Sequence, residues 1–519
     1  MKLPNVVGLV LVLSCCILES ISALQQQQQL QQFHIAPMQG YTNSSLRRLF
    51  NLLSPSSIKW TEMEKLDDIY PKTIQTQTQQ VQTQQVQQYQ TSESYLLDAL
   101  EKRIGSPSST DYDNNNNNLI LQLGSNHPGR LQSCVQHTVQ RYNDNNIREI
   151  NLNCGCPAID SGGSTTYGAS LMKDASLTGK LVQSVREGLV RGGGQSNTGI
   201  SVKCRIAVFD HESEQHYPLD ETDYEYLKKY ISTIYDAGAN HIILHARPAI
   251  LSGLSPVKNR IVPKLDYNFV ERIASDLSQE HDNNITFTLN GGITSLSQLQ
   301  SLIERNHDNS NNKSPISSYM AGRWCLQRPL DLIGIEELLL SSSSISSSSI
   351  SSSSSTTSSS LFLIRTAIEQ YVDDTVRIGC SSSLKYKPTI AELCLPLFLI
   401  VEQLRDDYDY EYDDDDDDDD DDDEGNNIDD EFDPIFLPTT KQRQEKPMLT
   451  YDEIESLYEV LVDGLDQIIE ELSPKNNNSN KKMKKKDNND INFKRLSSTF
   501  KSLVGTKVVN KWKRNRAEL

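Results

Sequence analysis

Eight short apolar or β-branched runs constrain the fold of this chain more than any other feature. Each run is followed by polar residues and then by a segment with helical periodicity. The runs are Phe33–Met38, Ile58–Met63, Leu119–Gly124, Glu149–Gly155, Ile200–Ile206, His241–Arg247, Ile285–Gly292 and Ser318–Trp324. They read as apolar on both faces, as buried parallel strands do, and eight strand–helix units predict a (β/α)8 barrel. A doubly wound open sheet is the competing architecture.

The ends of these runs favour the barrel over the open sheet. The polar or chemically useful residues at the ends are Pro37 and Met38, Glu62, Gln122, Asn153 with Cys156, Lys203 with Arg205, His245 with Arg247, Asn290–Gly292, and Gly322 with Arg323. In a barrel the carboxyl ends of all strands open on one face, and that face holds the site. An open sheet would concentrate such residues at one switch point.

The last two strand ends predict a phosphate site. Asn290-Gly291-Gly292 closes the seventh run and Gly322-Arg323 closes the eighth. Barrels often bind a phosphate between the seventh and eighth loops through glycine amides and a helix start. The guanidinium of Arg323 adds a charge-assisted contact.

The low-complexity segments limit how much of the chain can pack. They are Gln25–Gln32, Thr73–Gln90, Asn114–Asn118, Ser341–Ser360, Asp406–Asp433 and Lys475–Asp490. The net charge of −20 is the sum of regions of opposite charge, one acidic and one basic. The acidic region contains Asp413–Asp423, which is all aspartate. The tail from Lys475 to Leu519 carries fourteen Lys and Arg against three Asp and Glu, a net charge of +11. Such a tail suits a polyanion such as nucleic acid, and the alternative is a solubilising appendage.

The first 24 residues have the pattern of a targeting segment. Lys2 is followed by the apolar stretch Val6–Leu18 and by small residues near Ala23. The stretch is too short to span a bilayer comfortably, so we expect an organelle presequence, plastid or mitochondrial, or a cleaved signal, and no stable membrane association. A cytoplasmic protein with an incorrect gene start is the alternative. The nine cysteines form no CxxC pair, and we expect reduced thiols and no metal site.

The motifs at the strand ends resemble those of the tRNA-dihydrouridine synthases, flavin enzymes that reduce uridine in tRNA. The matching stretches are Ala36–Met38, Thr61–Met63, Leu121–Gly124, Glu149–Pro157, Val202–Ile206, Ile243–Arg247 and Asn290–Gly292. The stretch Leu251–Pro256, followed by Asn259-Arg260 and Pro263–Tyr267, resembles the A subfamily. The resemblance covers about residues 33–335.

The resemblance implies FMN at the barrel mouth and NADPH as its reductant. The residues that match cofactor contacts are Ala36, Pro37, Met38, Gln122, Lys203, His245, Asn290, Gly291, Gly292, Gly322 and Arg323. Lys203 matches a lysine near the flavin edge that becomes negative on reduction, where a cation stabilises the anion.

Cys156 matches the catalytic general acid of the family. Reduction of the uracil C5=C6 bond needs a hydride at C6 and a proton at C5, and a thiol above the flavin can deliver the proton. Cys154, two residues earlier, is interpreted as a packing residue. The residues expected to contact tRNA are Asn153, Arg247, Arg260, Lys507 and Lys511.

The region after the barrel predicts a small helical domain that binds tRNA. Helices are expected at Leu361–Tyr371, Thr389–Leu404, Tyr451–Leu472 and Phe493–Val504. Trp512 stands among lysines and arginines, which suits base stacking beside phosphate contacts. The alternative is a terminal amphipathic helix that packs Trp512 inward.

We therefore predict an FMN- and NADPH-dependent monomer that reduces D-loop uridines of tRNA around position 20. The alternatives are a small-molecule FMN oxidoreductase of the dihydroorotate or dihydropyrimidine dehydrogenase kind, and a non-catalytic tRNA-binding protein. The expected parts are a presequence (1–24), a glutamine linker (25–32), the FMN-binding barrel (33–340), a serine linker (341–360) and the tRNA-binding helical domain (361–519), with disordered inserts at 406–433 and 475–490.

Overall fold

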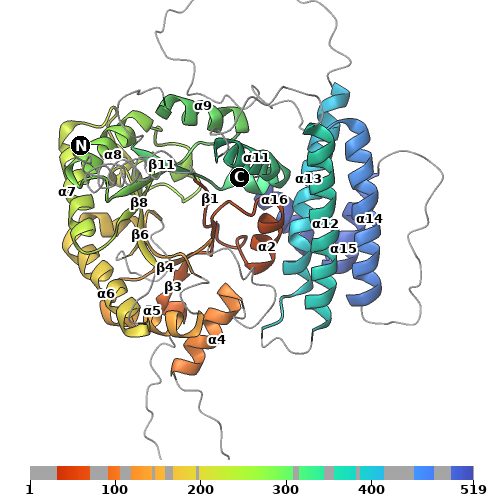
Figure 1. Cartoon of the computed structure of the whole chain (residues 1–519), viewed down its shortest axis with the longest axis horizontal. Helices are drawn as coiled ribbons and strands as arrows, with labels where there is room; N and C mark the ends of the chain where they lie inside the picture. Colours follow the sequence, from red (N-terminus) through yellow and green to blue (C-terminus); the bar gives the residue numbers. More distant parts are fainter. Residues whose placement is uncertain are drawn as a thin grey trace, which may run out of the picture.

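The computed structural model places a barrel beside a helical bundle (Figure 1). It describes residues 32–69, 92–105, 118–142, 147–157, 167–193, 198–307, 315–343, 356–381, 386–413, 449–472 and 492–517. The predicted presequence, the glutamine linker up to residue 31 and the insert at 475–490 lie outside these ranges, as does the acidic run after Asp413.

Eight parallel strands close into the barrel that the sequence predicts. They are β1 (Gln32–Ile35), β2 (Lys59–Trp60), β4 (Leu119–Gly124), β5 (Glu149–Cys154), β6 (Gly199–Arg205), β8 (His241–His245), β10 (Thr286–Asn290) and β11 (Ile316–Ala321). Each lies within or overlaps one of the eight runs. The pairing order is β1-β11-β10-β8-β6-β5-β4-β2, and a parallel bridge between His34 and Ile58 joins the two ends. The (β/α)8 architecture is confirmed, and the open sheet is excluded.

Helices cover the outside of the ring (Figure 1). They are α2 (Ser44–Leu53), α3 (Leu66–Ile69), α4 (Ser92–Ile104), α5 (Pro128–Tyr142), α6 (Ala175–Gly193), α7 (Glu221–Asp236), α8 (Tyr267–Glu280), α9 (Leu296–His307) and α11 (Leu332–Ser343). Three short strands were not predicted: β3 (Glu64–Lys65), and β7 (Val208–His211) paired with β9 (Ala249–Ser252). Helix α4 was also missed, although Leu96, Leu100 and Ile104 have helical spacing and are buried.

The inner face of the strands differs from the expectation of apolar residues on both faces. The outward side chains, such as Leu152, Val202 and Leu244, are buried in the main apolar cluster with the helices. Many inward side chains are polar instead. Near the amino ends, His241 Nδ1 donates to Glu149 Oε2 (2.8 Å), and His241 Nε2 lies 2.7 Å from Thr288 Oγ1. The expectation was wrong for this face because buried polar groups that bond one another can replace apolar contacts.

Glu149→Gln is expected to lower stability by about 1–3 kcal/mol near neutral pH, because a buried partner of His241 loses its charge. Burial alone would raise the pKa of Glu149, but His241, together with His34 and Ser201, outweighs burial, and the pKa falls to about 2, against an ordinary value of 4.5. A depressed carboxyl pKa stabilises the fold above the unfolded value, and this contribution is lost as the pH falls from about 4.5 toward 2. Urea unfolding measured from pH 6 to pH 3 should show that the difference in free energy of unfolding between wild type and variant becomes smaller below pH 4.5. A gap that stays constant over this range would contradict the argument.

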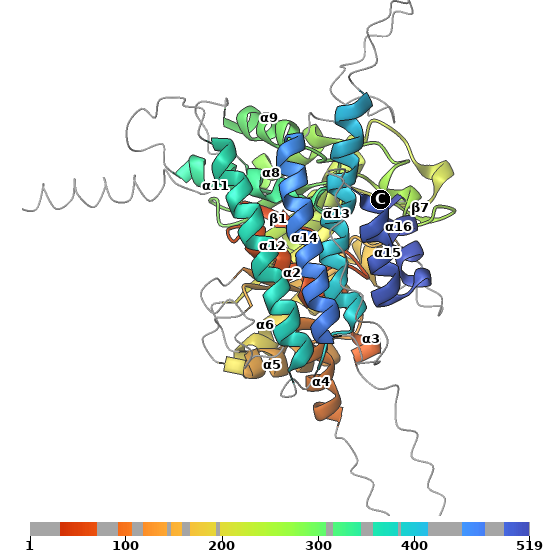
Figure 2. The ribbon, with the colours of Figure 1, turned by 90° about the vertical axis from the view of Figure 1, so that its right-hand side faces the viewer.

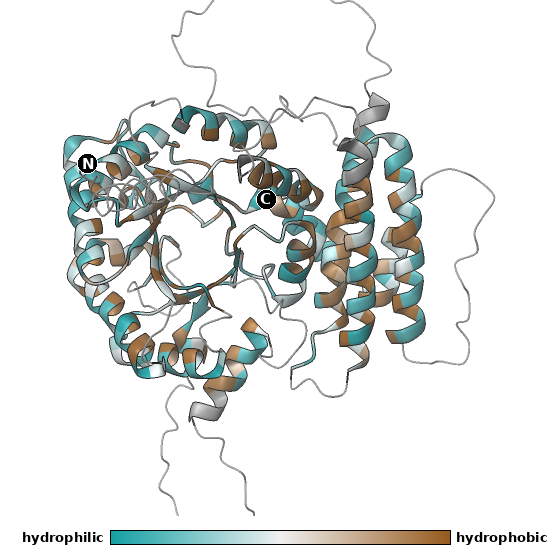
Figure 3. Cartoon of the chain, in the orientation of Figure 1, coloured by the Kyte–Doolittle hydropathy of each residue, from teal (hydrophilic) through white to brown (hydrophobic). Residues whose placement is uncertain are grey.

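The C-terminal region forms a bundle against the α2 side of the barrel (Figures 1 and 2). Its helices are α12 (Thr356–Cys380), α13 (Ile390–Asp413), α14 (Tyr451–Leu472), α15 (Phe493–Val504) and α16 (Thr506–Ala517). Apolar residues of these helices gather where they face one another and the barrel (Figure 3). The ion pair between Arg328 and Asp407 (2.6 Å) joins the barrel to α13.

Two predicted boundaries in this region are wrong. Helix α13 continues to Asp413, so Asp406–Asp413 is helical and not part of a disordered insert. Asp407 is buried beside Arg328, and this pairing explains why the helix does not stop where the acidic composition begins. The serine linker is also shorter than 341–360, because α11 ends at Ser343 and α12 begins at Thr356.

Trp512 packs inward, as the alternative interpretation of the tail expects. Its ring lies 5.1 Å from the ring of Phe398 between centroids, and the residue is 9% exposed. Arg516 on the same helix pairs with Asp406 (2.7 Å) and donates to the carbonyl oxygen of Gln327 (2.9 Å). The hypothesis that Trp512 stacks on a base is therefore wrong.

Among the described residues, no helix has both the length and the apolar content needed to cross a membrane.

Candidate active site at the barrel mouth

The predicted site residues, apart from those of the tail, converge at the carboxyl ends of the strands. Ala36–Met38 follow β1, Gln122 lies in β4, and Asn153 and Cys156 end β5. Lys203 lies in β6, His245 and Arg247 end β8, Asn290–Gly292 end β10, and Gly322 and Arg323 follow β11. Arg260 lies on the short helix η3 (Lys258–Arg260) above β8. Lys507 and Lys511 lie on α16 in the bundle, where both are exposed.

A chain of side-chain amides rises through the barrel toward Cys156. Asn151 Nδ2 donates to Ser201 Oγ (2.9 Å), and Gln122 Nε2 donates to Asn151 Oδ1 (2.8 Å). Asn153 Nδ2 then donates to Gln122 Oε1 (2.9 Å). Each amide in the chain uses its oxygen and one hydrogen, which fixes its orientation and leaves one hydrogen for a ligand. Gln122 and Asn153 therefore stand in fixed orientations at the base of the mouth.

The loop that carries Cys156 is held through its backbone. Asn153 Oδ1 accepts from the backbone N–H of Gly155 (3.1 Å) and of Cys156 (3.0 Å). The carbonyl oxygen of Cys156 accepts from the N–H of Ala169 (2.9 Å), and Gly168 leaves no room for a Cβ beside that carbonyl. Cys156 is partly exposed, whereas Cys154 is fully buried. The accessible thiol thus has a fixed backbone at the mouth.

Five cations at the mouth influence one another, and three of them, Lys203, Arg205 and Arg260, interact electrostatically with this thiol. The pKa of Lys203 is lowered to about 8 by burial and by Arg205. Burial followed by the charge of Arg323 lowers the pKa of Arg247 to about 10, and burial also lowers the pKa of Arg260 and of Arg323. Among the described residues, no carboxylate forms an ion pair with Lys203, Arg205, Arg247 or Arg260. The Nε atoms of Arg247 and Arg260 are buried without a hydrogen-bond partner. An anionic ligand would relieve both conditions.

His245 faces this cluster as a neutral ring. Burial and the charges of Arg205 and Lys203 hold its pKa well below the usual range. Gly291 (φ +111°) packs so closely on the ring that an added Cβ would lie 2.4 Å from His245 Cδ2. Asn290 Nδ2 donates to the carbonyl oxygen of Met320 (2.9 Å) and ties β10 to β11. The close approach explains why the seventh strand ends in glycine.

The first and last strands, β1 and β11, are neighbours in the ring, next to β10. A Cβ on Gly322 would lie 3.1 Å from both the Cβ of Ala36 and the Sδ of Met38. Glu62 accepts from the N–H of Gly40 (3.0 Å) and from Gln39 Nε2 (3.0 Å), and so fixes the loop after Met38. Glu62 therefore positions this loop, a role that its place at a strand end did not reveal.

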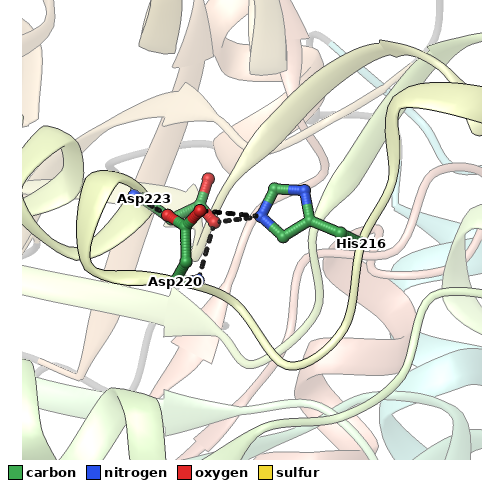
Figure 4. A group of neighbouring side chains, drawn as sticks. All are labelled: His216, Asp220 and Asp223. Atoms are coloured by element: carbon green, nitrogen blue, oxygen red, sulfur yellow. Dashed lines mark hydrogen bonds and ion pairs between the residues drawn. The ribbon is translucent and has the colours of Figure 1, made fainter.

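One group of possible metal ligands lies at the start of α7 (Figure 4). His216 Nε2 lies 2.6 Å from Asp223 Oδ2, and Asp220 Oδ1 accepts from the N–H of Thr222 and of Asp223. Asp220 and Asp223 form the capping box of α7; His216 and Asp220 are exposed, and Asp223 is partly buried. Helix capping accounts for the group.

The fold and the mouth define a (β/α)8-barrel enzyme whose active site joins an accessible thiol to an anion-binding cluster. A family model described as dihydrouridine synthase (Dus) matches residues 34–347. The chain therefore belongs to the dihydrouridine synthase family, and the resemblance drawn from the strand-end motifs, including that to the A subfamily, is confirmed.

Curated relatives share this family. A protein named tRNA-dihydrouridine(20/20a) synthase from Shewanella oneidensis is 28% identical over 310 residues, which are 60% of this chain and 72% of the relative. Proteins of the same name from Pasteurella multocida and from Escherichia coli K12 are 31% and 28% identical. These two matches cover 43% and 60% of this chain, and 57% and 70% of the relatives.

Proposed function

We propose that this protein reduces uridines of the tRNA D loop, at positions 20 and 20a, to 5,6-dihydrouridine, with FMN as cofactor and NADPH as reductant. The observation that carries the proposal is the accessible thiol of Cys156, held beside Lys203, Arg205 and Arg260 at the mouth of a family barrel. The names of the relatives supply the substrate and the two positions.

The residues at the mouth fit FMN. Arg247 and Arg260, which are expected to contact tRNA, carry buried Nε donors without a hydrogen-bond partner, which suits a phosphate of the tRNA beside the cofactor. Gly291 and Gly292, both at positive φ, let the backbone come close to a ligand. Gln122 retains one amide hydrogen for a ring carbonyl. Asn290–Gly292, Gly322 and Arg323 would hold the phosphate, and Ala36–Met38, Gln122, Lys203 and His245 would surround the ring.

When bound, reduced FMN would supply the hydride that uracil C6 needs. The protein's own residues provide the rest of the chemistry. Cys156 holds the proton that C5 requires, and the backbone contacts of its loop fix where that thiol stands. Lys203, whose pKa of about 8 leaves it easily protonated beside an anion, stabilises negative charge at the ring edge. The target base must leave its stack to reach this depth.

The full-length chain tests the function directly. Purified protein should be yellow, NADPH should bleach the flavin, and unmodified tRNA should restore the colour while its uridines at 20 and 20a gain two hydrogens by mass spectrometry. Recovery with a free pyrimidine such as uracil in place of tRNA would support the small-molecule oxidoreductase. Protein that binds tRNA but no flavin would support the non-catalytic alternative.

The exposed lysine and arginine side chains of α15 and α16 are expected to contact tRNA phosphates. The described part of these helices, residues 493–517, contains no Asp or Glu, and Lys507, Lys511 and Arg514 are exposed. Changing these three to Gln should weaken tRNA binding and flatten its dependence on salt. The slope of log K against log salt should fall by up to about 2–3, because each lost phosphate contact removes about 0.7–0.9. Filter binding from 50 to 300 mM salt measures it.

A matched control keeps the same change in charge. Lys180, Arg191 and Lys229 are exposed on α6 and α7, on the side of the barrel away from the bundle (Figure 1). Their replacement by Gln should leave the salt slope unchanged. Equal slopes for both triple variants would show that α16 is only a solubilising helix.

A further inference from the structure

We propose that Arg205 is a positioning residue: its single guanidinium joins the loop of Cys156 to the two loops that carry Arg247 and Arg260, and so holds the thiol in place for proton transfer. This inference rests on the proposed function where it is tested by flavin reoxidation, and on geometry alone where it is tested by alkylation of Cys156.

The contacts of Arg205 reach three separate loops. Its Nε donates to the carbonyl oxygen of Gly155 (3.1 Å). Its Nη1 donates to the carbonyl oxygens of Pro248 (3.1 Å) and of Asn259 (3.1 Å). Gly155 precedes Cys156, Pro248 follows Arg247, and Asn259 precedes Arg260. One side chain of β6 therefore touches the neighbour of each of these functional residues.

The environment of Arg205 disfavours the charged form of its guanidinium. The residue is 3% exposed, and its three protein partners are neutral carbonyls. Burial, with Arg247 and Arg260 nearby, lowers its pKa to about 9. An apolar side chain would fill a purely structural position at lower cost, because burying an unpaired charge is strongly unfavourable. A planar fork that can reach several acceptors at once is what guanidinium offers and ammonium does not.

The peptide group between Gly155 and Cys156 is hydrogen-bonded through both its carbonyl oxygen and its N–H. Arg205 holds the carbonyl oxygen of Gly155, while Asn153 Oδ1 holds the N–H of Gly155 and of Cys156. Without Arg205, Asn153 and the Ala169 N–H would still hold the loop, but its link to the other two loops would be lost.

The far end of the link is rigid. Asn259 is fully buried, and its side chain accepts from the N–H of Ile250 (2.8 Å) and donates to the carbonyl of Ile250 (2.9 Å). Arg260 therefore extends from an anchored residue. An anion that binds Arg247 or Arg260 contacts loops that Arg205 connects to the loop of Cys156. Under the proposal, binding of the ligand and placement of the thiol are therefore coupled through Arg205.

The test compares Arg205→Lys with Arg47→Lys. Arg47 is also buried and also donates to backbone carbonyls, those of Thr42, Arg103 and Ile104, and none of these three acceptors belongs to the loops that Arg205 joins. In flavin-loaded enzyme, Arg205→Lys should keep flavin reduction by NADPH and slow reoxidation by tRNA about 10–100-fold. Arg47→Lys should lower stability and leave the reoxidation rate of loaded enzyme unchanged. Arg205→Gln serves if the lysine variant does not fold.

Two further readouts separate positioning from general damage. The double variant Arg205→Lys/Cys156→Ala should be no slower than Cys156→Ala alone, because residues that act as a unit are not additive. Peptide-resolved alkylation of Cys156 should speed up several-fold in Arg205→Lys and not in Arg47→Lys. Additive losses in the double variant, or unchanged alkylation, would overturn the proposal. If wild-type flavin is not reoxidised by tRNA, the proposed function fails, and alkylation alone still decides the role of Arg205.

Discussion

Cys156→Ala is expected to lower dihydrouridine formation by about 10²–10⁴-fold, the usual loss on removing a general acid. Flavin binding and flavin reduction by NADPH should persist, because neither step needs a proton from the thiol. Single-turnover experiments that follow flavin absorbance with NADPH and then with tRNA separate the two steps. The expected result is normal bleaching and very slow recovery.

Cys154→Ala is the matched control. Cys154 is fully buried, it pairs in register with Cys204 of β6, and burial raises its pKa to about 12. A thiol without access to the mouth cannot reach uracil, so the variant should lose some stability and keep its turnover. Normal turnover in Cys156→Ala together with loss in Cys154→Ala would assign the proton to Cys154 instead.

Gly291→Ala is expected to yield protein that is purified without flavin. The added methyl would lie 2.4 Å from His245 Cδ2 and 2.8 Å from its Nε2, so the ring must move away from the mouth. The backbone at φ +111° lowers the free energy of unfolding of the variant by about a further 1–3 kcal/mol, because residues other than glycine rarely adopt this conformation. Flavin content by absorbance and FMN affinity by fluorescence measure the loss.

Gly253→Ala separates crowding from backbone strain. Gly253 also has a positive φ (+91°), but nothing lies within 4 Å of the position that its Cβ would take. This variant should lose a similar amount of stability and retain its flavin. Equal loss of flavin in both variants would show that strain, and not the displaced histidine, empties the site.

The strands and their ends could be predicted because a buried parallel strand leaves a local signature in the chain. The run at Leu119–Gly124 matches β4 at both ends, and Gln122 lies at the mouth as expected. The role of Arg205 could not be predicted in the same way. Its acceptors Gly155, Pro248 and Asn259 lie 43 to 54 residues away in the sequence, and only the closed ring brings them together. Its position at a strand end was visible, but its partners were not.

The polar interior was missed, and the inward packing of Trp512 was only one of two interpretations, for a related reason. A glutamate or histidine at a strand start, such as Glu149 or His241, looks like an exposed terminus until a partner is known across the barrel. Composition around Trp512 indicated a surface for nucleic acid, whereas Phe398, far earlier in the chain, provides the apolar contact that buries the ring. Sequence patterns report local preference, and these contacts are tertiary.

The order of the bundle helices along the chain has a consequence for synthesis. The barrel ring needs nothing beyond β11, so it can close while the ribosome is still making the bundle. Helix α13, by contrast, is made before the partners of its Phe398 and Asp406, because Trp512 and Arg516 lie on α16, after α14 and α15. The bundle therefore completes its packing only after α16 has been made. A nascent chain stalled before α16 would display an apolar surface and an unmatched acidic one, the kind of surface that chaperones bind.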